Sequence, residues 1–115
     1  MKQELARVLV DGTSVPIVRD TDQDRIEITI GDHTAFLTYH LKQKVLSLIH
    51  TEVPPALRGK RLGDELARSV LNDARDQGFT VKPYCPFVAG FISRHPEYAG
   101  LVDPGFVTSG DARSR

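Results

Sequence analysis

Cysteine, tryptophan and an excess of charge are what this chain of 115 residues lacks: it has one cysteine, no tryptophan, and 15 basic against 15 acidic residues. A single cysteine excludes an internal disulfide and the multi-cysteine zinc patterns. The four histidines lack the close pairing of a helical ligand set, so we predict no metal site. The balanced charge disfavours a nucleic acid or a membrane surface as the partner.

Long apolar runs are also missing. No stretch could span a bilayer, and no basic segment followed by an apolar one marks the start, so we expect a soluble cytoplasmic protein. A chain of this length forms one core but no separate substrate domain. Any active site must then be built from that core.

Alternating apolar and polar residues predict an antiparallel meander of strands over residues 25–30, 33–41 and 44–53. Before it, an apolar patch within the polar, turn-rich residues 1–24 fits either a frayed helical turn or an edge strand. We expect residues 1–24 to be a partly ordered segment, residues 25–102 to form the domain, and residues 103–115 to be a flexible tail.

A helix and a parallel strand are predicted next. From residue 60 to residue 77 apolar side chains recur at helical spacing, and Gly78 ends the pattern. The strand predicted for residues 79–84 should lie parallel to residues 44–53 through a right-handed crossover. Pro86 suits the first position of a second helix, which should run to about Arg94. The chain is thus predicted to form an α/β (α+β) mixed sheet with two main helices.

Residues 50–63 are predicted to be the centre of the molecule's function, because a strand there meets two prolines, a turn rich in glycine and arginine, and the start of the long helix. The unpaired amides of a first helical turn and the positive end of the helix dipole attract anions. Arg58, Lys60 and Arg61 add positive charge. A solvated basic helix start is the alternative, but basic residues there oppose the dipole, so a bound anion explains them better, and a ligand with a pyrophosphate would fit.

This turn resembles the pantetheine- and pyrophosphate-binding motif of the GNAT (N-acetyltransferase) superfamily, with Arg58, Arg61 and Gly63 at its first, fourth and sixth positions. The family usually has glycine where this chain has Arg61, and only glycine enters positive φ freely. Residues 83–89, followed by residues 94–98, extend the resemblance to most of the chain. Together these runs resemble the small single-domain GNAT-like subfamily with a cysteine after its fifth strand.

The resemblance implies a GNAT-like (acyl-CoA N-acyltransferase) fold, acetyl-CoA or coenzyme A as the cofactor, and acetyl transfer to an amine. In that picture the pantetheine arm lies between residues 44–53 and 79–84, where the two strands separate. Tyr98 has an equal alternative as a packing residue. The implied cofactor-binding residues are Val53, Arg58, Gly59, Lys60, Arg61, Leu62, Gly63, Tyr84 and Tyr98.

Cys85, Glu52 and His50 are the candidates for chemistry. Cys85 precedes the second helix, whose N-terminus would stabilise a thiolate, and the resemblance places it beside the acetyl thioester. A buried and inert cysteine is the alternative. Glu52 and His50 are two apart on one strand and share a face, and the resemblance makes such a glutamate the acceptor of the amine's proton. The alternatives are a Glu52 that caps a backbone amide and a half-buried His50.

The acceptor site is expected to be open, because this chain has a two-residue turn where the family has one or two helices between its first strands. An open site suits a protein or peptide amine, or is completed by a partner. The alternative function is a CoA-binding sensor or partner-binding module without catalysis, which Arg61 and the missing acceptor helices favour.

Overall fold

Six strands form one sheet whose order in space is the order of the sequence. The computed structural model describes residues 1–106. The first five strands pair antiparallel, and the last is added parallel to the fifth, which confirms the predicted meander and parallel pair. The strands are β1 (Lys2–Val10), β2 (Thr13–Asp20), β3 (Arg25–Ile30), β4 (His33–Lys42), β5 (Val45–Glu52) and β6 (Thr80–Pro83).

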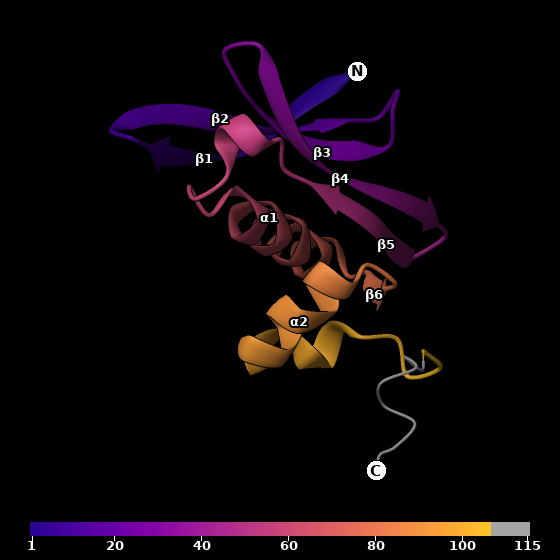
Figure 1. Ribbon diagram of the computed structural model, residues 1–115. Helices are drawn as coiled ribbons and strands as arrows, with labels where there is room; N and C mark the ends of the chain where they lie inside the picture. Colours follow the sequence, from indigo (N-terminus) through magenta and orange to yellow (C-terminus); the bar gives the residue numbers. More distant parts are fainter. Residues whose placement is uncertain (107–115) are drawn as a thin grey trace.

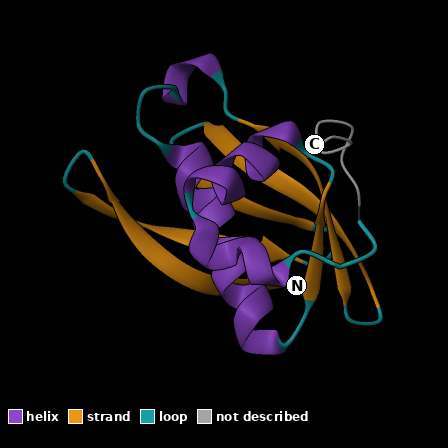
Figure 2. Ribbon diagram, turned by 90° about the horizontal axis from the view of Figure 1, so that it is seen from below, coloured by secondary structure: helices purple, strands orange, loops and turns teal. Residues whose placement is uncertain are grey.

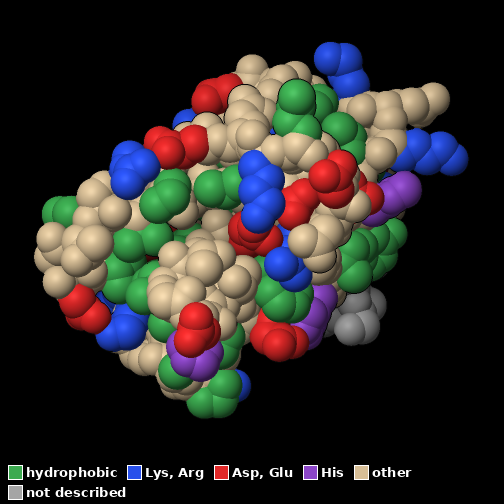
Figure 3. Space-filling view, turned by 90° about the horizontal axis from the view of Figure 1, so that it is seen from above, with side chains coloured by type: hydrophobic (Ala, Val, Ile, Leu, Met, Phe, Trp, Pro, Cys, Tyr) green, Lys and Arg blue, Asp and Glu red, His purple; other side chains and the backbone are tan. Residues whose placement is uncertain are grey.

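Two main helices, α1 (Leu62–Gln77) and α2 (Pro86–Arg94), lie on one face of the sheet (Figure 1), and Figure 2 shows them in front of the strands. The short 3₁₀ helices are η1 (Pro55–Leu57) and η2 (Pro96–Leu101). Neither main helix lies on the other face, where charged, histidine and hydrophobic side chains are interspersed (Figure 3). We call it the open face. No helix among residues 1–106 is long and apolar enough to cross a membrane.

The core fills the space between the sheet and α1. Strand residues at every second position, such as Ile26 and Ile28, are fully buried there, as are Leu66 and Leu71 of α1. At the helix end, Gly78 has φ 77° and the Phe79 amide donates to the Ala74 carbonyl at 2.9 Å. This is the glycine stop that the sequence predicts, closed by an apolar residue that packs against the core.

The N-terminal residues form the β1–β2 hairpin. Of the two structures that fitted the apolar patch in residues 1–24, the strand is the one observed, and the helical turn is not. The turn of the hairpin is Asp11 and Gly12, with φ of 51° and 82°. Two-residue hairpin turns require such positive φ values, and an Asp-Gly pair supplies them at low cost. Of the tail predicted to be flexible, residues 107–115 lie outside the described part of the chain.

Candidate active site

Strand β5 carries a bulge close to its end. Tyr39 pairs with Leu48 and Thr38 with His50, so Ile49 is an extra residue without an opposite partner. A bulge bends its strand and re-aims the side chains that follow it. Beyond it, His50 lies opposite Thr38 on the open face, whereas the next residue along β5 lies on the helical face.

The parallel strands β5 and β6 separate just past the same point. Their pairing runs from Val45 with Thr80 to Leu48 with Pro83 and stops there. Pro83 has no N–H to donate, and α2 begins three residues later. Within residues 1–106, the end of β5 after Leu48 therefore has no strand on this side, and its backbone groups are available to a ligand.

Cys85 lies at this separation, directly before α2, as the sequence predicts. Its amide donates to the Leu48 carbonyl at 2.9 Å, and its side chain is buried, with 4% exposed. The sulfur is 3.4 Å from the hydroxyl oxygen of Thr51, so Thr51 points toward the helices. Because alternate strand residues point to opposite faces, Cys85 is separated by β5 from His50 and Glu52.

His50 and Glu52 form an exposed pair on the open face. Nε2 of His50 is 3.3 Å from Oε1 of Glu52, and their side chains are 59% and 58% exposed. The predicted shared face is confirmed. The carboxylate of Glu52 contacts His50 rather than capping a backbone amide near Pro54, and the exposed His50 is not the half-buried residue of the alternative.

The turn before α1 brings free backbone amides together. The first hydrogen bond of the helix runs from the Glu65 amide to the Arg61 carbonyl at 3.2 Å, and no side chain caps this end. The amides of the three residues between them therefore have no partner within the helix. They border an open depression of about 190 Å³, lined by Val53, Leu57, Arg58, Gly59, Arg61, Leu62, Gly63, Asp64 and Phe87.

Six of the nine predicted cofactor residues line this depression, and three do not. Lys60 is tied to the hairpin turn by an ion pair with Asp11 at 2.6 Å. Tyr84 is 56% exposed and contacts the ring of Phe106. Tyr98 is buried, and its hydroxyl donates to Oδ1 of Asn72 at 2.9 Å. Tyr98 thus has the packing position of the alternative, away from the depression.

The sequence interpretation missed Phe87 and Thr51. Phe87 is 40% exposed at the start of α2, and its ring lies so close to Gly63 that a Cβ on that glycine would be 2.8 Å from the ring's Cζ atom. The signal for Phe87 was an aromatic residue at a position of the second helix that its apolar spacing does not turn toward the core. The signal for Thr51 was its place between His50 and Glu52, which puts it on the side of Cys85.

Arg61 adopts the left-handed backbone conformation at the point where the family usually has glycine, with φ 61° and ψ 29°. A side chain in this region costs about 1–2 kcal/mol. We predict that Arg61→Gly stabilises the fold by roughly 0.5–1 kcal/mol in urea unfolding, because glycine's freedom in the unfolded chain offsets part of the relief.

The same position tests the contact with the cofactor. If the guanidinium of Arg61 binds a phosphate, Arg61→Gly should change CoA affinity modestly and Arg61→Glu should lower it much more. Equal affinities of the two variants would show that the side chain points away from the phosphates. A less stable Arg61→Gly would contradict the assigned strain.

The mixed sheet, the bulged strand that parts from its parallel neighbour, and the helix that starts at a turn rich in glycine and arginine fit the GNAT fold. The family model described as GCN5-related N-acetyl-transferase matches residues 25–101, and the chain belongs to this family. The resemblance to a small GNAT-like domain is thereby confirmed.

Three curated relatives are each called Protein NATD1. The Bos taurus protein is 26% identical over 96 residues, which cover 77% of this chain and 85% of the relative. The Danio rerio protein is 25% identical, with 79% and 87% covered. For the Homo sapiens protein the identity is 24%, with 77% and 85% covered. The similarity extends over most of each chain.

Proposed function

We propose that this protein is an acetyl-CoA-dependent N-acetyltransferase that transfers acetyl to an amine. One observation carries the proposal: the depression at the start of α1, the separation of β5 from β6, and the exposed Glu52 all lie around the end of strand β5. Such an arrangement can hold a long anionic cofactor at one end and accept a proton from an incoming amine at the other. Membership of the GCN5-related family supports the same activity.

The residues of the depression fit a pyrophosphate. Unpaired helix amides and the positive end of the α1 dipole favour anions, and Arg58 and Arg61 supply charge at its rim. Arg58 is anchored by a bond from its Nε to the Val53 carbonyl at 3.2 Å, which leaves its terminal nitrogens for a ligand. The one acidic lining residue, Asp64, faces Arg94 at 3.7 Å, so its charge is compensated.

Glu52 is proposed to receive the proton of the incoming ammonium group, because only a neutral amine is nucleophilic. His50, 3.3 Å away, would hold the carboxylate in place. Bound acetyl-CoA would supply the acetyl group as an activated thioester. A C–N bond then forms at the amine while the C–S bond breaks, and the amine's second proton passes to the leaving thiolate. A backbone N–H on the free edge of β5 would donate to the carbonyl oxygen.

Charge reversal at the depression tests the cofactor assignment. Arg58→Glu should weaken CoA binding about tenfold or more in calorimetry, since a charge-assisted contact is worth about 1.5–3 kcal/mol. Lys42→Glu is the matched control, because it changes the net charge equally at the exposed far end of β4. Unchanged affinity in Arg58→Glu, or an equal loss in both variants, would overturn the assignment.

A non-catalytic CoA sensor is the second candidate function, because no helix within residues 1–106 covers the open face beside Glu52. The two functions differ in turnover. An enzyme releases free CoA thiol when acetyl-CoA is mixed with a panel of amines, whereas a sensor binds acetyl-CoA and releases none. A thiol assay over amino acids, polyamines and lysine peptides separates them.

A further inference from the structure

A continuous line of side chains crosses the open face from Glu52 to strand β3. The ring of His50 packs edge-to-face against Phe36, with the ring centres 6.4 Å apart. Arg25 lies on the neighbouring strand β3, and its guanidinium carbon is 4.8 Å from the centre of the Phe36 ring. Strand pairing places Arg25, Thr38 and His50 in one row, so the line ends about 10 Å from His50, two strand spacings away.

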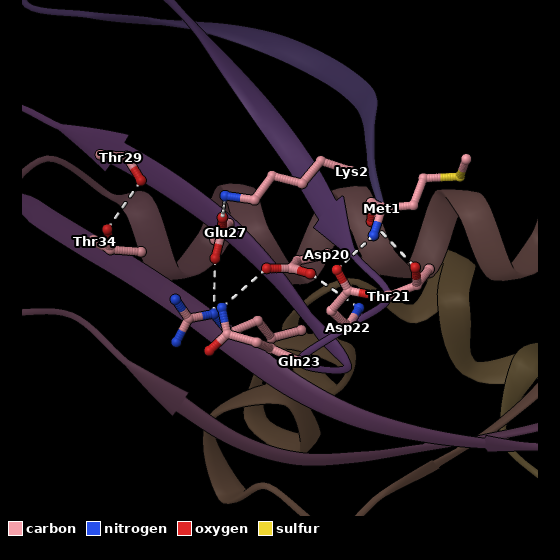
Figure 4. A network of polar contacts seen from close by, with 10 residues as sticks. Met1, Lys2, Asp20, Thr21, Asp22, Gln23, Glu27, Thr29 and Thr34 are labelled. Carbon is pink, nitrogen blue, oxygen red and sulfur yellow. Dashed lines mark hydrogen bonds and ion pairs between the residues drawn. The ribbon is translucent and has the colours of Figure 1, made fainter.

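Arg25 is held rigidly at the end of this line. Its Nε donates to Oε2 of Glu27 at 2.7 Å, and the Glu27 side chain is only 5% exposed. Lys2 donates to the other carboxylate oxygen at 2.9 Å (Figure 4). Two cations therefore share one buried carboxylate. The nearby Asp20 accepts from Gln23 and from the Asp22 amide instead.

The terminal nitrogens of Arg25 have no hydrogen-bond partner within residues 1–106. The side chain is 23% exposed, so part of it can be reached by a ligand. A guanidinium already fixed by stacking and by one carboxylate binds a second anion at little entropic cost. The bond to Glu27 raises the pKa of the Lys2 ammonium group, so Lys2 stays a cation beside Arg25.

We infer that the acceptor is a lysine side chain next to an acidic residue in a protein or peptide, with the amine at Glu52 and the acid on Arg25. This inference rests on the proposed acetyl transfer. From Glu52 the backbone of Arg25 lies about 10 Å across two strands and about 7 Å along β3, roughly 12 Å in all. A lysine stem of about 6 Å, one residue step of about 3.4 Å and an acidic side chain of about 2.5 Å together match this span. The stem would lie on the Phe36 ring. The α-amine and carboxylate of a free amino acid are too close together to reach both ends.

Matched peptides and three variants test this acceptor. One peptide has a lysine between two aspartates, and the other has asparagines in their place. Wild-type protein should prefer the aspartate peptide about tenfold in kcat/KM, as expected for a charge-assisted contact. Arg25→Gln should reduce this preference to about one, and Arg25→Lys should keep part of it. Arg7→Gln, which removes a charge from β1 away from Phe36, should leave it unchanged.

The ratio of the two peptides separates recognition from a structural role. If Arg25 only holds Glu27 and Phe36 in place, Arg25→Gln slows both peptides equally and the inference is wrong. Equal kcat/KM for both peptides in the wild type would also overturn the inference. So would transfer to small amines without transfer to either peptide. Both of these results leave the proposed activity standing. CoA binding without transfer to any amine overturns the inference and the proposed activity together.

Discussion

Glu52→Gln should lower kcat for acetyl transfer about 100-fold or more at neutral pH while CoA affinity stays unchanged. Glutamine keeps the size of the side chain but cannot take a proton, and a positioned general base contributes typically about 10²–10⁴-fold. Glu52 lies on the open face and outside the phosphate depression, so cofactor binding should not depend on it. Steady-state kinetics and CoA calorimetry on the same preparation check both halves of the prediction.

Cys85→Ala is the informative comparison. Cys85 lies across β5 from Glu52, beside Thr51, where it would border the acyl group. A covalent route would acetylate the thiol and then require the amine to attack the enzyme-bound acetyl group. On that route Cys85→Ala should keep CoA binding and transfer more slowly, with some acetyl adduct in intact-mass spectra of the wild type. If Cys85→Ala transfers as fast as wild type while Glu52→Gln is slow, transfer is direct.

Gly63→Val should abolish CoA binding at concentrations that saturate the wild type, and lower the stability by about 1–3 kcal/mol. Even a Cβ atom at Gly63 would be 2.8 Å from the Phe87 ring, so the ring or the first turn of α1 must move. The valine would also fill the depression in front of the helix amides. Calorimetry with CoA and urea unfolding measure the two effects.

Phe87→Ala separates crowding from loss of the phosphate site. Combined with Gly63→Val it should restore most of the stability, because it removes the ring that the valine meets. CoA binding should recover less, since the valine still projects toward the amides of α1. A Gly63→Val protein with wild-type stability and affinity would show that the ring swings away freely and that the phosphates bind elsewhere.

The secondary structure of residues 25–94 was predictable because each element has a strong local signal. Alternation marks β3 and β4, helical spacing marks α1, and Gly78 and Pro86 mark an end and a start. The β1–β2 hairpin was harder to predict, because its apolar residues are few and fit two patterns. Pairing of β2 with β3 and burial of Val15 and Ile17 against the core make it a strand pair.

The candidate site was predictable only in part. The phosphate turn is contiguous in sequence, so its residues could be named from a motif. Phe87 meets Gly63 across two helices, and Thr51 meets Cys85 across 34 residues, and no local pattern encodes such contacts. The positions of Lys60 and Tyr98 also depend on distant partners, Asp11 and Asn72.

The sequence by itself determined the order of strands and helices from β3 to α2, the glycine- and arginine-rich turn at the start of α1, and the shared face of His50 and Glu52, since all of these follow from spacing along one chain segment. Only the tertiary structure decided that Cys85 and Glu52 lie on opposite sides of β5. It also decided that Arg25 stacks on Phe36 near that glutamate. The bulge at Ile49 and the pairing of β3, β4 and β5 set those positions, and both arise from packing between distant segments.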